Sequence, residues 1–223
     1  MKRLEATSLH QNCNTVILTP TRGSVTGSDF IPLRWHRAIS QLVRPINSRI
    51  HHQECAGAEV GQAYNALVSF TLKNPTLSTW PYILTCEDDT LMPRDGLLSL
   101  LADIGDYDAL AGVYFTKEDN GHALMYGDPT SEGEINFRPR IGPVDSIIPV
   151  YGAGMGFTLF KMDVFRKLEE PWFKTYTDMS EGMVDQGTQD IYFFRRMAEA
   201  GMKVAVSTKV RCTHLDTSTD RMY

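Results

Sequence analysis

Three adjacent acidic residues directly follow an apolar run that predicts a buried strand. The run covers residues 82–86, and Glu87, Asp88 and Asp89 come next. In an open parallel sheet, the carboxyl ends of the strands form the ligand crevice. Mg²⁺ and Mn²⁺ prefer such carboxylate oxygens and share them with substrate phosphates. The triplet therefore indicates a divalent-metal site, and an exposed acidic turn that caps the next helix near Pro93 is the alternative.

Two residues later in the chain could act with this triplet. His214 lies at the end of the last predicted strand and becomes a metal-ligand candidate if that strand lies near Asp89. Asp190 lies in the first turn of an amphipathic helix, where it could take a proton from an acceptor hydroxyl. The alternatives are a structural histidine and an acid that complements the helix dipole.

Two glycine-containing segments could approach a ligand. Pro20-Thr21-Arg22-Gly23 follows the first predicted strand, a position that suits contact with a nucleotide, although it lacks the spacing and the lysine of a Walker A loop. The segment 152–156 is not a dinucleotide fingerprint, because Phe157 stands where the last glycine is required. We expect its glycines to permit close backbone approach to a ligand.

The elements that must position these residues alternate between short apolar runs and helical patterns. In the first half, the pattern predicts strands at 15–19, 47–52, 82–86 and 109–115, and helices at 32–43, 57–73 and 93–102. Pro20 is expected to end the first strand. In the second half, it predicts a hairpin near Asn120-Gly121 and Gly127-Asp128, strands at 145–150, 157–161, 204–207 and 210–213, and a helix at 188–200. The alternation predicts a parallel sheet with helices on both faces.

Length and composition fit a single globular domain. The chain has 223 residues and a net charge of -5, so a basic nucleic-acid-binding surface is not expected. We expect a loose arm at 1–14 and one domain at 15–223. No stretch is long and apolar enough for a membrane span, and the N-terminus lacks a signal-peptide core, so we expect a cytoplasmic protein. The four cysteines have no metal or redox spacing and are expected to be free thiols.

Four segments together resemble a GT-A fold glycosyltransferase of the broad family-two kind. They are 16–23, 82–93, 151–157 with 171–173, and 187–194 with 201–204. The resemblance implies an α/β fold: a Rossmann-like, mixed, mostly parallel sheet flanked by helices. Two departures are the acid Glu87 in place of the first aspartate of Asp-x-Asp, and Gln189 in place of the glutamate before the base.

The resemblance also implies a mechanism and a set of residues. A Mn²⁺ or Mg²⁺ ion would bind the diphosphate of a UDP- or GDP-linked sugar, and an aspartate would activate the hydroxyl of a glycan or other acceptor, with inversion. The matching positions are Asp89, His214 and Glu87 for the metal; Thr19, Pro20, Arg22, Glu87, Asp88 and Gly154 for the donor; Gln189 and Trp172 for the acceptor; and Asp190 for the base. The loops 117–136 and 175–187 would read the acceptor.

Two other functions stay open. A sugar-phosphate nucleotidyltransferase could share the fold, although that class is expected to carry a glycine-rich basic loop after the first strand, where only Arg22 and Gly23 stand. A non-catalytic protein that binds nucleotide sugars or glycans is the second alternative, and the replacement at Gln189 is its best support.

Overall fold

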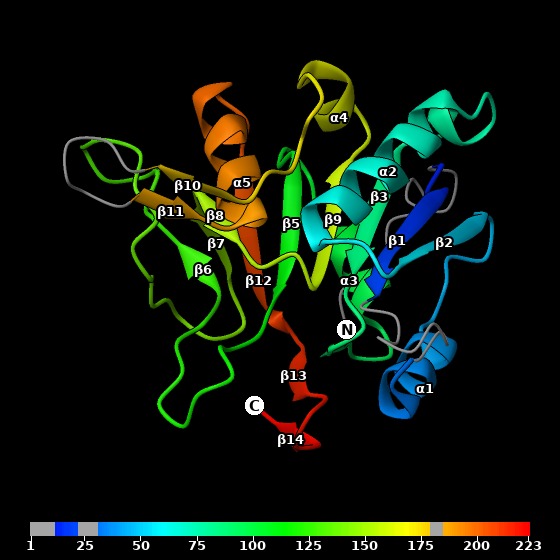
Figure 1. The fold of residues 1–223 in the computed structure, drawn as a ribbon, viewed down its shortest axis with the longest axis horizontal. Coiled ribbons are helices and arrows are strands. Elements are labelled where there is room, and N and C mark those ends of the chain that lie inside the picture. The colour runs from blue at the N-terminus through cyan, green and yellow to red at the C-terminus, as the bar shows by residue number, and fades with distance from the viewer. Residues whose placement is uncertain (1–11, 22–30, 179–184) are drawn as a thin grey trace.

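A computed structural model of the chain describes residues 12–21, 31–178 and 185–223. Its centre is a seven-stranded sheet (Figure 1). In spatial order the strands are β2 (Ile50–Ala56), β1 (Thr15–Thr21), β3 (Tyr82–Cys86), β9 (Phe157–Lys161), β5 (Ala109–Val113), β12 (Val204–Arg211) and β7 (Ile147–Val150). Five strands run parallel, whereas β9 and β7 run antiparallel to their neighbours. The expected mixed, mostly parallel α/β sheet is therefore confirmed.

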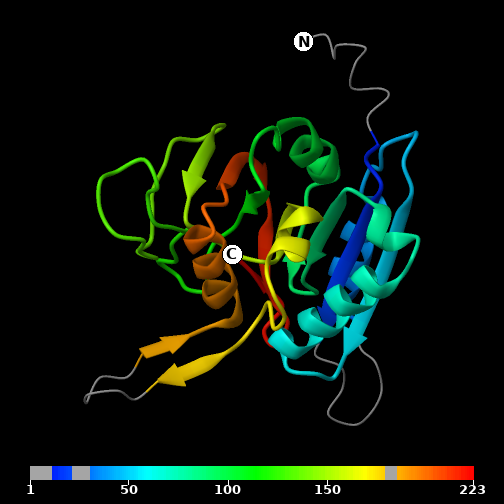
Figure 2. The ribbon, with the colours of Figure 1, turned by 90° about the horizontal axis from the view of Figure 1, so that it is seen from above.

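Helices cover both faces of this sheet (Figure 2). Side chains alternate along β1, so Val16 and Leu18 pack in one core and Ile17 in the other. The first core includes residues of α2 (Val60–Lys73), α4 (Asp163–Lys167) and α5 (Gln189–Glu199). The second includes residues of α1 (Leu33–Gln41) and α3 (Gly96–Asp103). A 3-10 turn at Leu77–Thr79 lies between α2 and β3. In the described part of the chain, no helix is long and apolar enough to cross a bilayer.

Three small sheets lie beside the central one. They pair β6 (Met125–Tyr126) with β8 (Gly152–Ala153), β10 (Tyr176–Asp178) with β11 (Asp185–Gly187), and β13 (Thr213–Asp216) with both β14 (Arg221–Met222) and β4 (Thr90–Leu91). The last of these sheets matters most for the site, because β4 directly follows the acidic triplet. Its pairing with β13 therefore brings the last part of the chain to the carboxyl end of β3.

Several sequence expectations need correction. Pro20 does not end the first strand, which continues to Thr21. The pairing of β1 with β3 ends at Leu18, whereas its pairing with β2 continues through Pro20, so the proline sits where the strand has a partner on one side only. The strands expected at 204–207 and 210–213 are the single β12, with an irregularity after Ser207, followed by β13.

Other boundaries shift less. The second strand lies at Ile50–Ala56 rather than 47–52, and the third helix at Gly96–Asp103 rather than 93–102. The sequence pattern did not predict α4 or the β10–β11 pair. Most of the expected N-terminal arm lies outside the described residues, whereas all four cysteines lie within them and are free thiols, as expected.

Candidate active site

A pocket opens at the edge of the sheet where β1 and β3 end. Its volume is about 340 Å³. The end of β1, the N-terminal turns of α2 and α5, and the loop after β3 supply its lining residues, which are Pro20, Thr21, Ala58, Val60, Glu87, Asp88, Asp89 and Gln189. This is the edge at which open α/β sheets bind ligands. The acidic triplet therefore lies in a pocket rather than in an exposed turn.

A tight turn presents the triplet to this pocket. The backbone N–H of Thr90 donates to the carbonyl of Glu87 at 3.1 Å, and the N–H of Glu87 donates to the carbonyl of Gly156 at 3.1 Å. Asp88 is 9% exposed, and the Asp89 side chain is 13% exposed. Three carboxyl groups are thus held in a small, largely desolvated volume.

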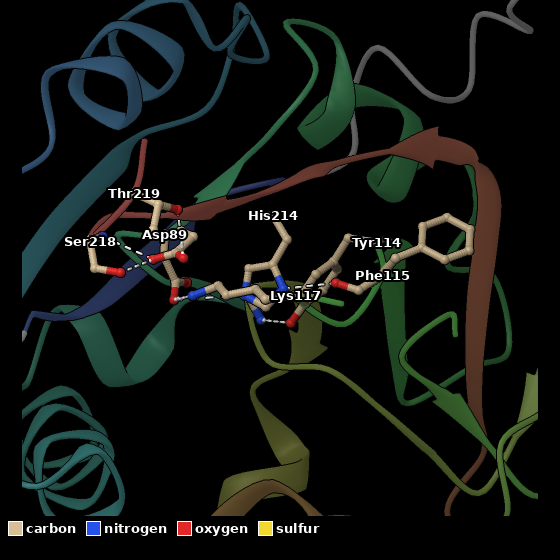
Figure 3. Close-up of polar contacts among 9 residues, drawn as sticks. Asp89, Tyr114, Phe115, Lys117, His214, Ser218 and Thr219 are labelled. Atoms are coloured by element: carbon tan, nitrogen blue, oxygen red, sulfur yellow. Dashed lines mark hydrogen bonds and ion pairs between the residues drawn. The ribbon is translucent and has the colours of Figure 1, made fainter. Parts of the chain in front are cut away.

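Asp89 faces the side chains of a lysine and a histidine (Figure 3). Its Oδ2 lies 2.6 Å from Nζ of Lys117 and 3.7 Å from Nε2 of His214. The histidine is 14% exposed and the lysine 25% exposed. The expected meeting of residues 89 and 214 is therefore observed.

Strand pairing explains how His214 reaches Asp89. In the β4–β13 ladder His214 lies opposite Thr90, and the N–H of Leu215 donates to the carbonyl of Asp89 at 2.7 Å. The His214 Nδ1 lies 2.8 Å from the carbonyl oxygen of Phe115. Because a carbonyl oxygen can only accept, Nδ1 carries the proton. In the neutral ring, Nε2 therefore keeps its lone pair on the side of Asp89.

These two side chains fit a divalent cation. A carboxylate oxygen and an imidazole nitrogen whose other nitrogen bonds a backbone carbonyl form a common metal-ligand arrangement. Among the described residues, no group of three or more His, Cys, Asp and Glu side chains has the geometry to hold a metal. A Mn²⁺ or Mg²⁺ ion at Asp89 and His214 would therefore take further oxygens from phosphate and water, as these ions usually do.

The pKa values of the two outer carboxyl groups of the triplet are shifted in opposite directions. Burial, with the nearby charges of Asp89 and Asp190, raises the pKa of Glu87, although the Tyr64 hydroxyl donates to its Oε1 at 3.1 Å. Burial also acts to raise the pKa of Asp89, but its interactions with His214 and Lys117 outweigh burial and lower that pKa. Asp89 is therefore the carboxylate that stays ionised.

Asp190 lies in the first turn of α5, next to the pocket residue Gln189. Its Oδ1 accepts hydrogen bonds from the Thr188 hydroxyl and from the N–H of Ile191. Asp190 thus accepts a hydrogen bond from a backbone N–H in the first turn of α5. This is the structural role expected if Asp190 only stabilises the start of the helix. Its negative charge is also one of the causes that raise the pKa of Glu87.

Other predicted site residues serve the fold. The Thr19 hydroxyl lies 2.8 Å from Nε2 of His52, and Thr19 does not line the pocket. Trp172 is 5% exposed, and its indole N–H donates to two backbone carbonyls, which places its side chain in the core rather than at an acceptor. A Cβ at Gly154 would lie 2.2 Å from the Tyr114 hydroxyl, so this glycine makes room for Tyr114 rather than for a donor. Arg22 lies outside the described residues.

Lys117 and Tyr64 belong to the site and were not predicted for it. Lys117 follows β5, which ends at the same edge of the sheet as β1 and β3. Ligands bind at the carboxyl ends of parallel strands, and this argument could therefore have identified Lys117 as well as the triplet. Tyr64 lies at a position of α2 whose helical spacing predicts a core residue. That spacing does not indicate that its hydroxyl would contact Glu87.

Comparisons with known proteins identify the fold. No family model matches the sequence, and no curated protein does. Similar solved structures include A197 from STIV (TM-score 0.63, 16% identity, 94% of this chain and 92% of that chain). GalNAc-T7, crystallised with UDP, GalNAc and Mn²⁺, is similar over 92% of this chain and 44% of its own (TM-score 0.53, 9% identity). A Bacillus anthracis protein assigned as a glucose-1-phosphate thymidylyltransferase, in complex with a sucrose, is similar over 93% of this chain and 91% of its own (TM-score 0.53, 13% identity).

At these identities the likenesses establish the fold alone. The chain has a GT-A-like, Rossmann-like fold of the kind found in a glycosyltransferase and a nucleotidyltransferase. The resemblance to family two stays a prediction.

Proposed function

We propose that the chain is a metal-dependent glycosyltransferase that moves a sugar from a nucleotide sugar to an acceptor hydroxyl. The observation that carries the proposal is the convergence of Asp89 Oδ2 and His214 Nε2, 3.7 Å apart, beside an acidic pocket. A nucleoside diphosphate would meet carboxylates there, so it needs a cation between itself and the protein. The likeness to a structure that holds UDP, GalNAc and Mn²⁺ supports the same ligand class.

In this proposal, Asp89 and His214 hold the cation, and Pro20, Thr21 and Asp88 contact the donor. When bound, the Mn²⁺ or Mg²⁺ ion stabilises the negative charge of the departing diphosphate. The acceptor oxygen forms a bond to the anomeric carbon as the bond from that carbon to the diphosphate oxygen breaks. Asp190 takes the proton of the acceptor hydroxyl. In this single displacement the acceptor attacks the face opposite the departing diphosphate, so we expect inversion at the anomeric carbon.

A sugar-phosphate nucleotidyltransferase is the second candidate. Its support is the likeness to the thymidylyltransferase-like protein, which extends over 91% of that chain. Both chemistries need a cation at an acidic pocket. They differ in the bond that breaks, since nucleotidyl transfer joins a sugar phosphate to a nucleoside triphosphate and releases pyrophosphate. A pure binding protein would perform neither reaction.

The test measures binding first and products second. Titration with UDP- and GDP-sugars, with Mn²⁺ and with EDTA, should show binding that needs the cation. Bound donor should then be hydrolysed slowly or transferred to an acceptor, with release of nucleoside diphosphate. Pyrophosphate release from a nucleoside triphosphate and a sugar phosphate would favour the second candidate. Absence of all nucleotide binding would refute both.

A further inference from the structure

Lys117 occupies the position that a cation would need at Asp89. It comes from the loop after β5, and its Nζ lies 2.6 Å from Oδ2, the same oxygen that Nε2 of His214 faces at 3.7 Å. Figure 3 shows the lysine reaching the aspartate from one side and the histidine beside it. The proposed function gives Lys117 no role, although among the described residues it forms an ion pair with Asp89 at 2.6 Å.

An ammonium group and a dication cannot share this oxygen without cost. With both at contact distance from Oδ2, two positive centres would lie a few ångströms apart in a largely buried site, where like charges repel strongly. A cation that binds both Nε2 of His214 and the Asp89 oxygen that this nitrogen faces competes with Lys117 for Oδ2. The free energy of this ion pair is therefore subtracted from the free energy of cation binding.

The Lys117 side chain is the more solvent-accessible partner of this ion pair, since it is 25% exposed and Asp89 is 13% exposed. Its ammonium can take a phosphate oxygen as a new partner in place of Asp89. Lysine is a common phosphate ligand that acts as a point charge. A diphosphate bound in the pocket at Asp89 offers such oxygens.

We propose that Lys117 is a built-in competitor of the divalent cation at Asp89 and passes to the donor diphosphate when the cation binds. This inference rests on the proposed function. Its consequence is linkage: the cation alone binds weakly, and nucleoside diphosphate strengthens cation binding because it stabilises the released lysine. By reciprocity, the cation strengthens nucleotide binding by the same factor.

The test compares Mn²⁺ binding to the full chain, with and without UDP, by electron paramagnetic resonance of free Mn²⁺. Lys117→Met should bind Mn²⁺ alone at least about tenfold more tightly than the wild type, the low end for a close charge pair. Its gain in Mn²⁺ affinity on adding UDP should be smaller than that of the wild type. Lys117→Gln removes the charge but can still donate a hydrogen bond to Asp89, and it provides a second variant should Lys117→Met fold poorly.

Lys209→Met is the matched control. It removes one lysine charge from another ion pair, Lys209 Nζ to Asp103 Oδ2 at 3.1 Å, between β12 and the last residue of α3. Its Mn²⁺ affinity should equal that of the wild type. If Mn²⁺ and UDP bind but neither Lys117 variant binds Mn²⁺ more tightly than Lys209→Met, the inference is overturned and the proposed function stands. If no variant binds Mn²⁺ or UDP, both fail.

Discussion

Nδ1 of His214 and the carbonyl oxygen of Phe115 lie 2.8 Å apart, so the backbone that follows β5 orients the imidazole toward Asp89. This contact joins the segment after β5 to β13. It also fixes the tautomer that leaves Nε2 available.

We predict that His214→Ala weakens Mn²⁺ binding by at least about tenfold, because it removes one of the two proposed protein ligands and leaves Asp89 alone. The fold should persist, since the β4–β13 pairing is a backbone contact. Isothermal titration with Mn²⁺ and UDP measures the effect. The exposed His36→Ala on α1 is the control, and equal losses in both variants would argue against His214 as a ligand.

Asp190→Asn should preserve donor binding and lower the rate of transfer by about 10²–10⁴-fold, because the amide cannot accept the acceptor proton. The amide oxygen can still accept from the N–H of Ile191, so α5 should form normally. Donor affinity and single-turnover transfer separate the two effects. Asp163→Asn, an acid in the first turn of α4, should change neither. Undiminished turnover in Asp190→Asn would reject Asp190 as the base.

Gly154→Ala should destabilise the fold by about 1–3 kcal/mol, because the added Cβ would lie 2.2 Å from the Tyr114 hydroxyl. The same change in a Tyr114→Phe background should cost less, since the nearest clashing atom is gone. Denaturant unfolding of the wild type, the two single variants and the double variant gives the double-mutant cycle that measures this difference. Equal costs in both backgrounds would show that Tyr114 is not the reason for glycine at this position.

Glu87→Gln should stabilise the cation-free protein, and more so as the pH rises. Burial, with the charges of Asp89 and Asp190, raises the pKa of Glu87 in the folded state. A raised folded pKa contributes stability that is present below the unfolded pKa, about 4.3, and is lost as the pH rises through the folded pKa.

The neutral amide avoids this loss and can still accept from Tyr64. We therefore expect a gain of about 1–2 kcal/mol at about pH 8 and a smaller gain at about pH 5, measured by denaturant unfolding in EDTA. A gain that does not grow with pH would contradict the electrostatic account of Glu87.

The sequence predicts the elements whose signal is local. The strands at 82–86 and 157–161 have the expected boundaries. The first is an apolar run between Pro81 and the acidic Glu87, and the second begins after Gly156 and ends at Lys161. β9 lies between β3 and β5 and is antiparallel to both. This position depends on residues far away in the sequence, so the local sequence pattern does not predict it.

The same division holds for the site. Asp89 could be predicted because it directly follows a recognisable strand. The placement of His214 depends on β4, a two-residue strand too short to show a pattern. Trp172 was expected to bind the acceptor but is buried in the core, because a sequence does not distinguish an aromatic residue that packs in the core from one that contacts a ligand. Lys117 also follows a predicted strand and could have been a candidate on that ground, but its contact with Asp89 is seen only in the structure.

Crystallisation with Mn²⁺ and UDP, with an anomalous difference map for manganese, tests the central proposal most directly. We predict one strong peak within ligand distance of Asp89 Oδ2 and His214 Nε2, with Lys117 moved from the aspartate. Manganese bound elsewhere, or UDP bound in this pocket with Lys117 still on Asp89 and no metal, would contradict it.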